Sequence, residues 1–278
     1  MTQVDSDAVG ELIRRAVAEA ITPRFRQLSA GDVEEKSPGE TVTIADREAE
    51  AIISRGLNDL LPGVPVIGEE AVASDPGLLD ALHTAELAWL VDPLDGTSNF
   101  IDGSPVWGTA VARDRDGETV AAWMLRSDGA LFTAERNAGA YQDGVRLEIG
   151  VRGEDTDPKQ LRGAVLTRFL TDAERTGMAP GLARLGGVLD GYKCTVFEYP
   201  ALIAGEEDFA LFQRLLPWDH APGTLLLTEA GGVAAHPDGR PFRPDHVNRR
   251  GLLLARDMRT WTTVRDLLYP ALVGATPG

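Results

Sequence analysis

The sequence predicts a protein of mixed α and β structure with an antiparallel sheet in its N-terminal half. Apolar residues recur at helical spacing in residues 1–21 and again after Asp46, which indicates two amphipathic helices. Several short apolar runs then follow one another through tight turns such as Asp116-Gly117, which is typical of sequential β-hairpins. Helices followed by hairpins predict an α+β arrangement.

Composition places the chain among globular proteins. Of its 278 residues, 43% are hydrophobic and 25% are charged, which provides the apolar material for a substantial core. The net charge of −16 repels nucleic-acid phosphates and anionic membrane surfaces, so neither is an expected partner. An acidic protein that handles an anionic substrate is expected to bind a divalent cation.

The expected location is the cytoplasm. Cys194 is the one cysteine, which excludes an internal disulfide and argues against a cysteine-based zinc site. No stretch has the length and apolar character of a membrane span, and charged residues interrupt the first helix where a signal peptide would be apolar.

The N-terminal elements can be assigned in chain order. Residues 1–21 predict a helix, residues 31–41 a polar loop and residues 42–44 a short strand, after which Asp46 opens the second helix. The strands expected next are residues 64–67, 87–91, 107–113, 119–125, 130–134 and 140–142.

A polar stretch at residues 150–159 predicts a boundary between an N-terminal half, residues 1–150, and a C-terminal half, residues 151–278. The C-terminal half is expected to contain a strand at residues 163–166, helices at 171–185 and 221–230, and mixed structure at 196–211.

The segment D-P-L-D-G-T-S-N-F, which begins at Asp92, directly follows one predicted strand. Pro93 breaks the strand ladder, and Gly96 permits a backbone conformation closed to other residues. Such a turn can aim Asp92, the Leu94 carbonyl and Asp95 at one point, and these oxygen donors suit Mg²⁺.

The same segment contains no basic residue from Asp92 through Gly103. Crowded carboxylates without a counter-charge raise one another's pKa, and a bound cation is the simplest resolution. The backbone amides of Gly96, Thr97 and Ser98 could receive a phosphate oxygen where a short helix begins.

Each of these motifs also has a structural interpretation. Asp-Gly is a common turn, Thr-Ser a common helix cap, and the pair Glu69-Glu70 could lie on a solvated face. Asp219, in the segment W-D-H-A-P-G, could cap the helix that follows it, and Asp46 could cap its own helix. Both roles can hold together, so the two interpretations stay open.

Taken together, these segments resemble the inositol monophosphatase family of lithium-sensitive, Mg²⁺-dependent phosphatases, through nearly the whole chain. The matching segments are residues 36–46 (K-S-P-G-E-T-V-T-I-A-D), residues 68–70 (G-E-E), residues 92–100, residues 134–147 and residues 218–232. Their order along the chain makes the match specific.

The resemblance implies a layered α-β-α-β-α sandwich, with an antiparallel N-terminal sheet and a mixed C-terminal sheet, and a homodimer. It also implies two or three Mg²⁺ ions per subunit. One ion would be held by Glu69, Asp92 and the Leu94 carbonyl, and a second by Asp92, Asp95 and Asp219.

The implied reaction is hydrolysis of a small phosphate monoester by direct attack of a metal-activated water, with inositol monophosphate or a related sugar or polyol phosphate as substrate. Thr97, hydrogen-bonded to Asp46, would orient and deprotonate the water. Glu69 would share in catalysis, with a third, weaker ion near Glu69 and Asp46. Substrate contacts are expected from Gly96, Thr97, Ser98, Glu198 and Phe212.

Several positions depart from the family pattern. Glu40 stands in place of the usual aspartate, and Phe212 falls where inositol-phosphate enzymes often carry a carboxylate. Glu198 falls where asparagine is common, and His220 belongs to an altered helix start that is expected to pack or face solvent. Alternatives are therefore a phosphatase for fructose 1,6-bisphosphate, histidinol phosphate or 3′-phosphoadenosine 5′-phosphate, or a non-catalytic regulatory protein on the same fold.

Overall fold

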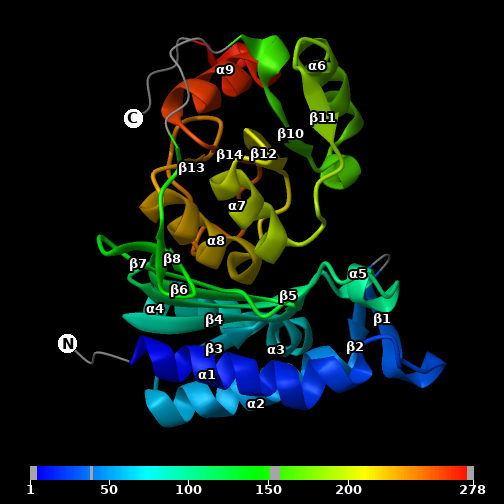
Figure 1. Ribbon diagram of the computed structural model, residues 1–278, viewed down its shortest axis with the longest axis vertical. Helices are drawn as coiled ribbons and strands as arrows, with labels where there is room; N and C mark the ends of the chain where they lie inside the picture. Colours follow the sequence, from blue (N-terminus) through cyan, green and yellow to red (C-terminus); the bar gives the residue numbers. More distant parts are fainter. Residues whose placement is uncertain (1–4, 38–39, 151–156, 274–278) are drawn as a thin grey trace.

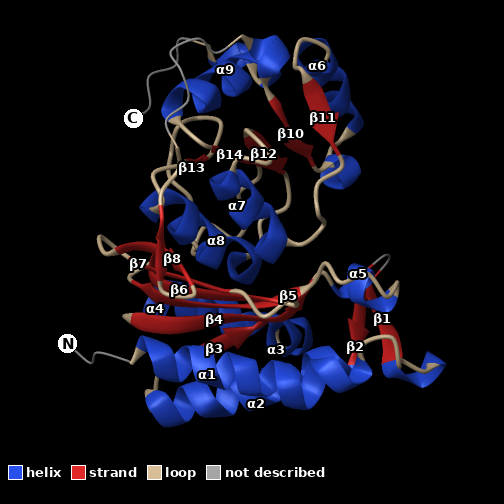
Figure 2. Ribbon diagram, in the orientation of Figure 1, coloured by secondary structure: helices blue, strands red, loops and turns tan. Residues whose placement is uncertain are grey.

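The structure is a computed structural model that describes residues 5–37, 40–150 and 157–273, and its elements form five layers (Figure 1 and Figure 2). The outer helices of the N-terminal half are α1 (Ser6–Ala16) and α2 (Ile44–Leu60). The middle layer contains α7 (Thr195–Ala204) and α8 (Pro217–Glu229), and the last layer α6 (Asp172–Leu182) and α9 (Met258–Leu268). A sheet separates each pair of helical layers, so the predicted α-β-α-β-α sandwich is confirmed.

The sheet of the N-terminal half has seven strands in chain order, and all neighbours are antiparallel except β3 and β4. Its strands are β3 (Val66–Gly68), β4 (Leu87–Asp95), β5 (Gly108–Arg115), β6 (Glu118–Arg126), β7 (Leu131–Glu135), β8 (Gly139–Gln142) and β9 (Val145–Leu147). The predicted hairpins are confirmed. Short helices connect the first strands: α3 (Glu69–Ser74) and α4 (Ala81–Thr84) link β3 to β4, and α5 (Thr97–Ile101) links β4 to β5.

The sheet of the C-terminal half is mixed, as predicted. Its strands are β10 (Arg162–Val165), β11 (Gly187–Leu189), β12 (Phe209–Phe212), β13 (Val233–Ala235) and β14 (Leu252–Ala255). They lie in the order β11-β10-β12-β14-β13, and the pairs on the β11 side are parallel whereas those on the β13 side are antiparallel.

The layers are joined by a shared apolar core. Tyr199 of α7 and Leu226 of α8 are fully buried in one cluster with Met124 of β6 and Ala210 of β12, so both sheets contribute to it. Among the described residues, no helix is long and apolar enough to cross a membrane. Because this core contains residues of both halves, the division of the chain at residue 150 stays a prediction.

The prediction of a polar loop at residues 31–41 is wrong for those of its residues that the structure describes. Residues on both sides of positions 38 and 39, which lie outside the described residues, form an antiparallel hairpin of β1 (Val33–Ser37) and β2 (Glu40–Thr43). Both strands are short, and the sequence of β1 carries charges instead of the apolar alternation by which a strand is recognised, whereas β2 overlaps the strand expected at residues 42–44.

Two predicted element ends are also corrected. Helix α8 begins at Pro217, four residues earlier than expected, so Asp219 lies in its first turn and does not cap it. Strand β4 does not stop at Asp92 but continues to Asp95, because a bulge accommodates Pro93. Asp219 and Asp95 therefore lie in a helix and in a strand, and this regular structure fixes the direction of their carboxylates.

Two helical glycines give a test of this packing. Alanine at Gly223 of α8 would place its Cβ 2.1 Å from a ring atom of the buried Tyr199, whereas at Gly177 of α6 no atom lies within 4 Å of the added Cβ. We expect Gly223→Ala to lower the free energy of unfolding by about 1–3 kcal/mol through overpacking, and Gly177→Ala to raise it by about 0.5–1 kcal/mol through chain entropy. Urea denaturation measures both, and a stable Gly223→Ala protein would contradict the described contact of α7 with α8.

Candidate active site

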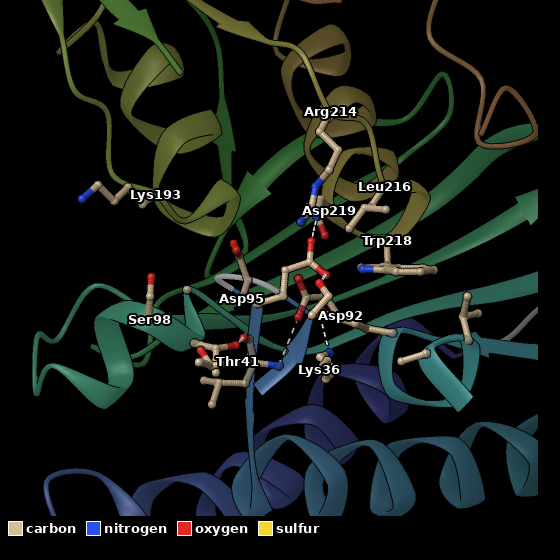
Figure 3. A pocket seen from close by; sticks show the side chains of 18 of the residues that line it. Lys36, Thr41, Asp92, Asp95, Ser98, Lys193, Arg214, Leu216, Trp218 and Asp219 are labelled. Atoms are coloured by element: carbon tan, nitrogen blue, oxygen red, sulfur yellow. Dashed lines mark hydrogen bonds and ion pairs between the residues drawn. The ribbon is translucent and has the colours of Figure 1, made fainter. Parts of the chain in front are cut away.

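A cleft of about 430 Å³ opens between the N-terminal sheet and the C-terminal half (Figure 3). One wall is formed by the β1–β2 hairpin, the end of β4 and the start of α5, and the opposite wall by the loops before α7 and α8. The predicted residues Gly96, Thr97 and Ser98 line the cleft. Its floor is acidic.

Three carboxylates from separate elements meet at this floor. Glu69 is the first residue of α3, Asp92 lies in β4 and Asp219 lies in the first turn of α8. Each offers an oxygen atom, and these three atoms lie within 4.8 Å of one another. Parallel pairing of β3 with β4 brings the ends of both strands to the same edge of the sheet, which is why Glu69 and Asp92 meet.

The bulge in β4 sets the direction of the central motif. In the pairing with β5, Asp92 lies opposite Ala110 and Asp95 opposite Gly108, so the register shifts between the two aspartates. The Leu94 N–H donates to Asp92 Oδ1 over 3.1 Å. The strand therefore aims two carboxylates into one cleft although they are three residues apart.

Gly96 is required at the turn that follows. Its φ of 83° is in the left-handed region, and an added Cβ would lie 2.9 Å from the Val106 carbonyl oxygen. This turn starts α5, so Thr97 and Ser98 enter the first turn of a short helix beside the carboxylates.

Asp95 lies at the edge of the cluster, held by the start of α7. Its Oδ2 accepts hydrogen bonds from the Val196 N–H over 2.6 Å and the Thr195 hydroxyl over 2.8 Å, and the Cys194 Sγ lies 3.2 Å away. Burial raises the pKa of Asp95, and these donors oppose the rise. The carboxylate lines the cleft, with one oxygen fixed by the protein.

The expected hydrogen bond between Thr97 and Asp46 is present. The Thr97 hydroxyl lies 3.0 Å from Asp46 Oδ1 and 2.9 Å from the Leu94 carbonyl oxygen. The other oxygen of Asp46 accepts from the Thr43 N–H and hydroxyl, which completes a capping box at the start of α2. Burial, opposed by these Thr43 bonds, raises the pKa of Asp46 to about 7. Asp46 thus takes part in capping its own helix and is also bonded to Thr97 of the cleft.

No role was assigned from the sequence to Lys36 and Glu50, which bind at the start of α3. Lys36 Nζ of β1 lies 2.9 Å from Glu69 Oε1 and 2.6 Å from Glu70 Oε1, and although burial lowers the pKa of Lys36, these carboxylates raise it. Glu50 of α2 accepts from the Glu70 and Ala71 N–H groups, each over 2.8 Å. Lys36 could have been suspected because it begins the segment 36–46 that matches the family. Nothing in the sequence distinguishes Glu50 from the other charged residues of α2.

The floor has the chemistry of a hard-cation site. Burial, followed by the charges of the neighbouring carboxylates, raises the pKa of both Asp92 and Asp219 well above the usual range. Three clustered carboxylates offer oxygen ligands alone, which is the donor set that Mg²⁺ prefers. The residues present therefore fit such an ion, which would relieve their mutual repulsion.

Glu198 and Phe212 do not line this cleft. Glu198 lies in the first turn of α7 and is fully buried. Its Oε2 accepts a hydrogen bond from the Tyr192 N–H over 2.8 Å. Phe212 is buried against Tyr199 and His220. Their expected role as substrate contacts is corrected by these positions.

His220 is buried, as the packing interpretation required. Its Nε2 lies 3.3 Å from the Arg214 carbonyl oxygen, so this nitrogen donates, and its Nδ1 accepts from the Tyr199 hydroxyl over 3.0 Å. Burial lowers the pKa of His220 to about 4, which keeps the ring neutral. The histidine supports the loop that precedes α8.

Fold and floor together define a class: a layered α/β sandwich with a cluster of carboxylates that could hold a metal ion at the floor of its cleft. The chain belongs to the inositol monophosphatase family, whose model matches residues 3–269. It is therefore a member of a phosphatase family.

Relatives and solved structures agree with this membership. The chain is 32% identical over 229 residues to an inositol-1-monophosphatase of Rhizobium meliloti (strain 1021), which covers 77% of this chain and 79% of the relative. It is 30% identical over 230 residues to the protein named Nus factor SuhB of Escherichia coli (strain K12), covering 80% and 81% of the two chains. The fold is similar to that of the extragenic suppressor protein suhB from Bartonella henselae, with a TM-score of 0.77, 23% identity, and coverage of 94% of this chain and 98% of that one.

The buried Glu198 makes stability depend on pH. Burial and the neighbouring charge of Glu207 raise the pKa of Glu198 from 4.5 to about 9. The unfolded carboxyl ionises above about pH 4.5 and the folded one above about pH 9, so this group lowers stability progressively as the pH rises through that window. We expect Glu198→Gln, which retains an acceptor for the Tyr192 N–H, to be more stable than the parent at pH 8, with the difference shrinking toward pH 5.

Urea denaturation at pH 5 and pH 8 measures this effect, and Glu11→Gln on the exposed face of α1 serves as the control. Parallel pH dependences of Glu198→Gln and the parent would show that Glu198 is ionised in the folded protein and would contradict the assignment.

Proposed function

We propose that this protein is a Mg²⁺-dependent phosphatase that hydrolyses a small phosphate monoester, such as inositol monophosphate or a related sugar or polyol phosphate. The observation that carries the proposal is the meeting of Glu69, Asp92 and Asp219 beside the hydrogen-bonded pair of Thr97 and Asp46. This arrangement supports the proposal because it would place a cation next to Thr97, whose hydroxyl lies in the cleft and is bonded to the buried Asp46.

The chain's own residues would act as follows. The N–H groups at Gly96, Thr97 and Ser98 are available at the start of α5 to orient the phosphate. A water bonded to the Thr97 hydroxyl attacks phosphorus, and its proton passes through Thr97 to Asp46. The bond from phosphorus to the ester oxygen breaks, and the leaving alkoxide takes a proton from solvent water. A pKa near 7 suits Asp46 for this transfer.

Mg²⁺, held by Glu69, Asp92, the Leu94 carbonyl, Asp95 and Asp219, would supply charge stabilisation of the attacking and leaving oxygens. The proposal includes two or three ions per subunit, a homodimer and a cytoplasmic location, which rest on the resemblance to the family alone. Lys36, which also lines the cleft, holds Glu69 in place through an ion pair.

Phosphate release from inositol 1-phosphate tests the reaction. We expect release with Mg²⁺ and none with EDTA, and we expect Asp95→Asn to lower turnover at least about 100-fold, because even partners of metal ligands contribute 10- to 100-fold. Asp102→Asn is the matched control, since Asp102 lies in the same segment but is exposed at the end of α5. Undiminished turnover of Asp95→Asn at verified metal loading would contradict its role.

Ion binding can be measured separately from turnover. Saturating Mg²⁺ should raise the midpoint of thermal unfolding of the parent, by an amount equivalent to about 2.7 kcal/mol at 100 times the dissociation constant. Asp219→Asn should lose most of this shift, and Asp102→Asn should keep it. An equal shift in all three proteins would place the bound ion elsewhere.

A non-catalytic role on the same fold is the second candidate, favoured by the relatives whose name is Nus factor SuhB. The complete set of carboxylates and the Thr97–Asp46 pair speak for catalysis, because a site released from selection for turnover would be expected to lose one of them. If no ester in a broad substrate panel yields phosphate with Mg²⁺, this second candidate replaces the proposal.

A further inference from the structure

Helix α3, which presents Glu69 to the cluster of carboxylates, begins without a cap of its own. The first N–H groups of any helix lack partners within the helix. The residue that precedes α3 is Gly68, which has no side chain to offer them. Because α3 has six residues, its own hydrogen bonds stabilise it little. The direction of Glu69 therefore depends on what holds this start in place.

The carboxylate of Glu50 supplies the cap from a different helix. Glu50 Oε2 accepts from the Glu70 N–H and Oε1 from the Ala71 N–H, each over 2.8 Å. Two acceptor oxygens on two successive N–H groups fix the rotation of the first turn as well as its position, which a single acceptor cannot do. Glu50 is 7% exposed, so solvent offers these N–H groups little alternative.

Glu50 takes its own position from the core. It lies one turn after Asp46 in α2, so the two carboxylates share a face of that helix. Ile53 of the same helix is buried in one cluster with Val91 of β4, the residue before Asp92. Through Asp46 and Glu50, one anchored helix is bonded to both the proposed catalytic hydroxyl and the helix of a proposed metal ligand.

The backbone at Gly68 passes close to the Glu50 carboxylate. A Cβ added at Gly68 would lie 2.3 Å from Glu50 Cδ, although the φ of Gly68, −97°, is one that any residue adopts. Glycine is thus required here by the carboxylate and not by the backbone conformation. This contact explains why a glycine stands directly before the pair Glu69-Glu70.

A cap for stability alone would not need this side chain. Serine or asparagine caps a helix without a charge, whereas Glu50 adds a buried carboxylate beside Glu69 and Glu70, where like charges repel. Lys36, labelled in Figure 3, offsets part of this repulsion through ion pairs with the latter two. The double hydrogen bond lies where a metal ligand needs a fixed direction.

We propose that Glu50 is a positioning residue of the metal site: its carboxylate holds the start of α3 and so keeps Glu69 directed at the oxygens of Asp92 and Asp219. Glu50 itself lies outside the lining of the cleft. The inference rests on the metal site of the proposed phosphatase, and it adds the residue that prepares this ligand before an ion binds.

Mn²⁺ binding to the full chain, measured by electron paramagnetic resonance of the free ion, tests the proposal without any substrate. Glu50→Gln retains one acceptor oxygen and turns an NH₂ donor toward the other N–H of α3. We expect the dissociation constant for Mn²⁺ to rise about 10- to 100-fold, the effect typical of residues that orient a metal ligand. Asp59→Asn, exposed on the same helix, is the matched control and should bind Mn²⁺ as the parent does.

Gly68→Ala separates the position of the carboxylate from its charge. The added methyl displaces the Glu50 carboxylate, which ends a flexible side chain, and leaves its charge in the protein. We expect a rise in the Mn²⁺ dissociation constant similar to that of Glu50→Gln, and this variant carries the test if Glu50→Gln does not fold. The double variant Glu50→Ala/Gly68→Ala should bind no more weakly than Glu50→Ala alone, because the methyl then occupies vacated space.

Urea denaturation without metal distinguishes a role in stability alone. In that case Glu50→Gln lowers the free energy of unfolding but leaves the Mn²⁺ dissociation constant of the folded protein unchanged, which overturns the inference. Weakened binding in Glu50→Gln with parental binding in Gly68→Ala also overturns it, because the effect then belongs to the charge of Glu50.

The parent protein separates this inference from the proposed function. A parent that binds Mn²⁺ and releases phosphate from inositol 1-phosphate keeps the phosphatase function standing even if both variants bind Mn²⁺ as tightly, a result that overturns the role of Glu50. A parent that binds no Mn²⁺ overturns the metal site and the inference together.

Discussion

Repulsion among buried carboxylates is the constraint around which this molecule is organised. Asp92, Asp95 and Asp219 are held in or beside a cleft with the negative charge of Glu69 next to them, and burial raises the pKa of each of the three aspartates. Such an arrangement is costly to fold without compensation. Its persistence in a well-packed protein is explained if a cation belongs among these oxygens.

Rigid elements from both halves of the chain hold these carboxylates close together. Asp92 belongs to the bulged strand β4, Glu69 begins α3 where the neighbouring strand β3 ends, and Asp219 lies in the first turn of α8. The first turn of α7 fixes one oxygen of Asp95. Because each carboxylate is anchored in regular structure or by backbone donors, the ligands are positioned before any ion binds.

Much of this was readable in the sequence, for identifiable reasons. The hairpins from β5 to β8 were found because their apolar runs and tight turns are local signals, and the motif beginning at Asp92 carries its Pro93 and Gly96 within a few residues. The strand expected at residues 42–44 overlaps β2, but β1 and its pairing with β2 were missed because the sequence of β1 is charged and shows no apolar alternation. Glu198 and Phe212 were expected in the cleft by their position along the chain, but the direction of a side chain on α7 or β12 depends on packing that the sequence does not display.

The most direct test of the account is the position of a bound ion. Mn²⁺ accepts the same oxygen ligands as Mg²⁺ and can be located by its anomalous scattering in crystals grown with the ion. The account predicts a peak among the carboxylate oxygens of Glu69, Asp92 and Asp219, with the Leu94 carbonyl beside it. Absence of a peak there at saturating Mn²⁺, or a peak bound by other residues alone, would contradict the central claim that these carboxylates form a metal site.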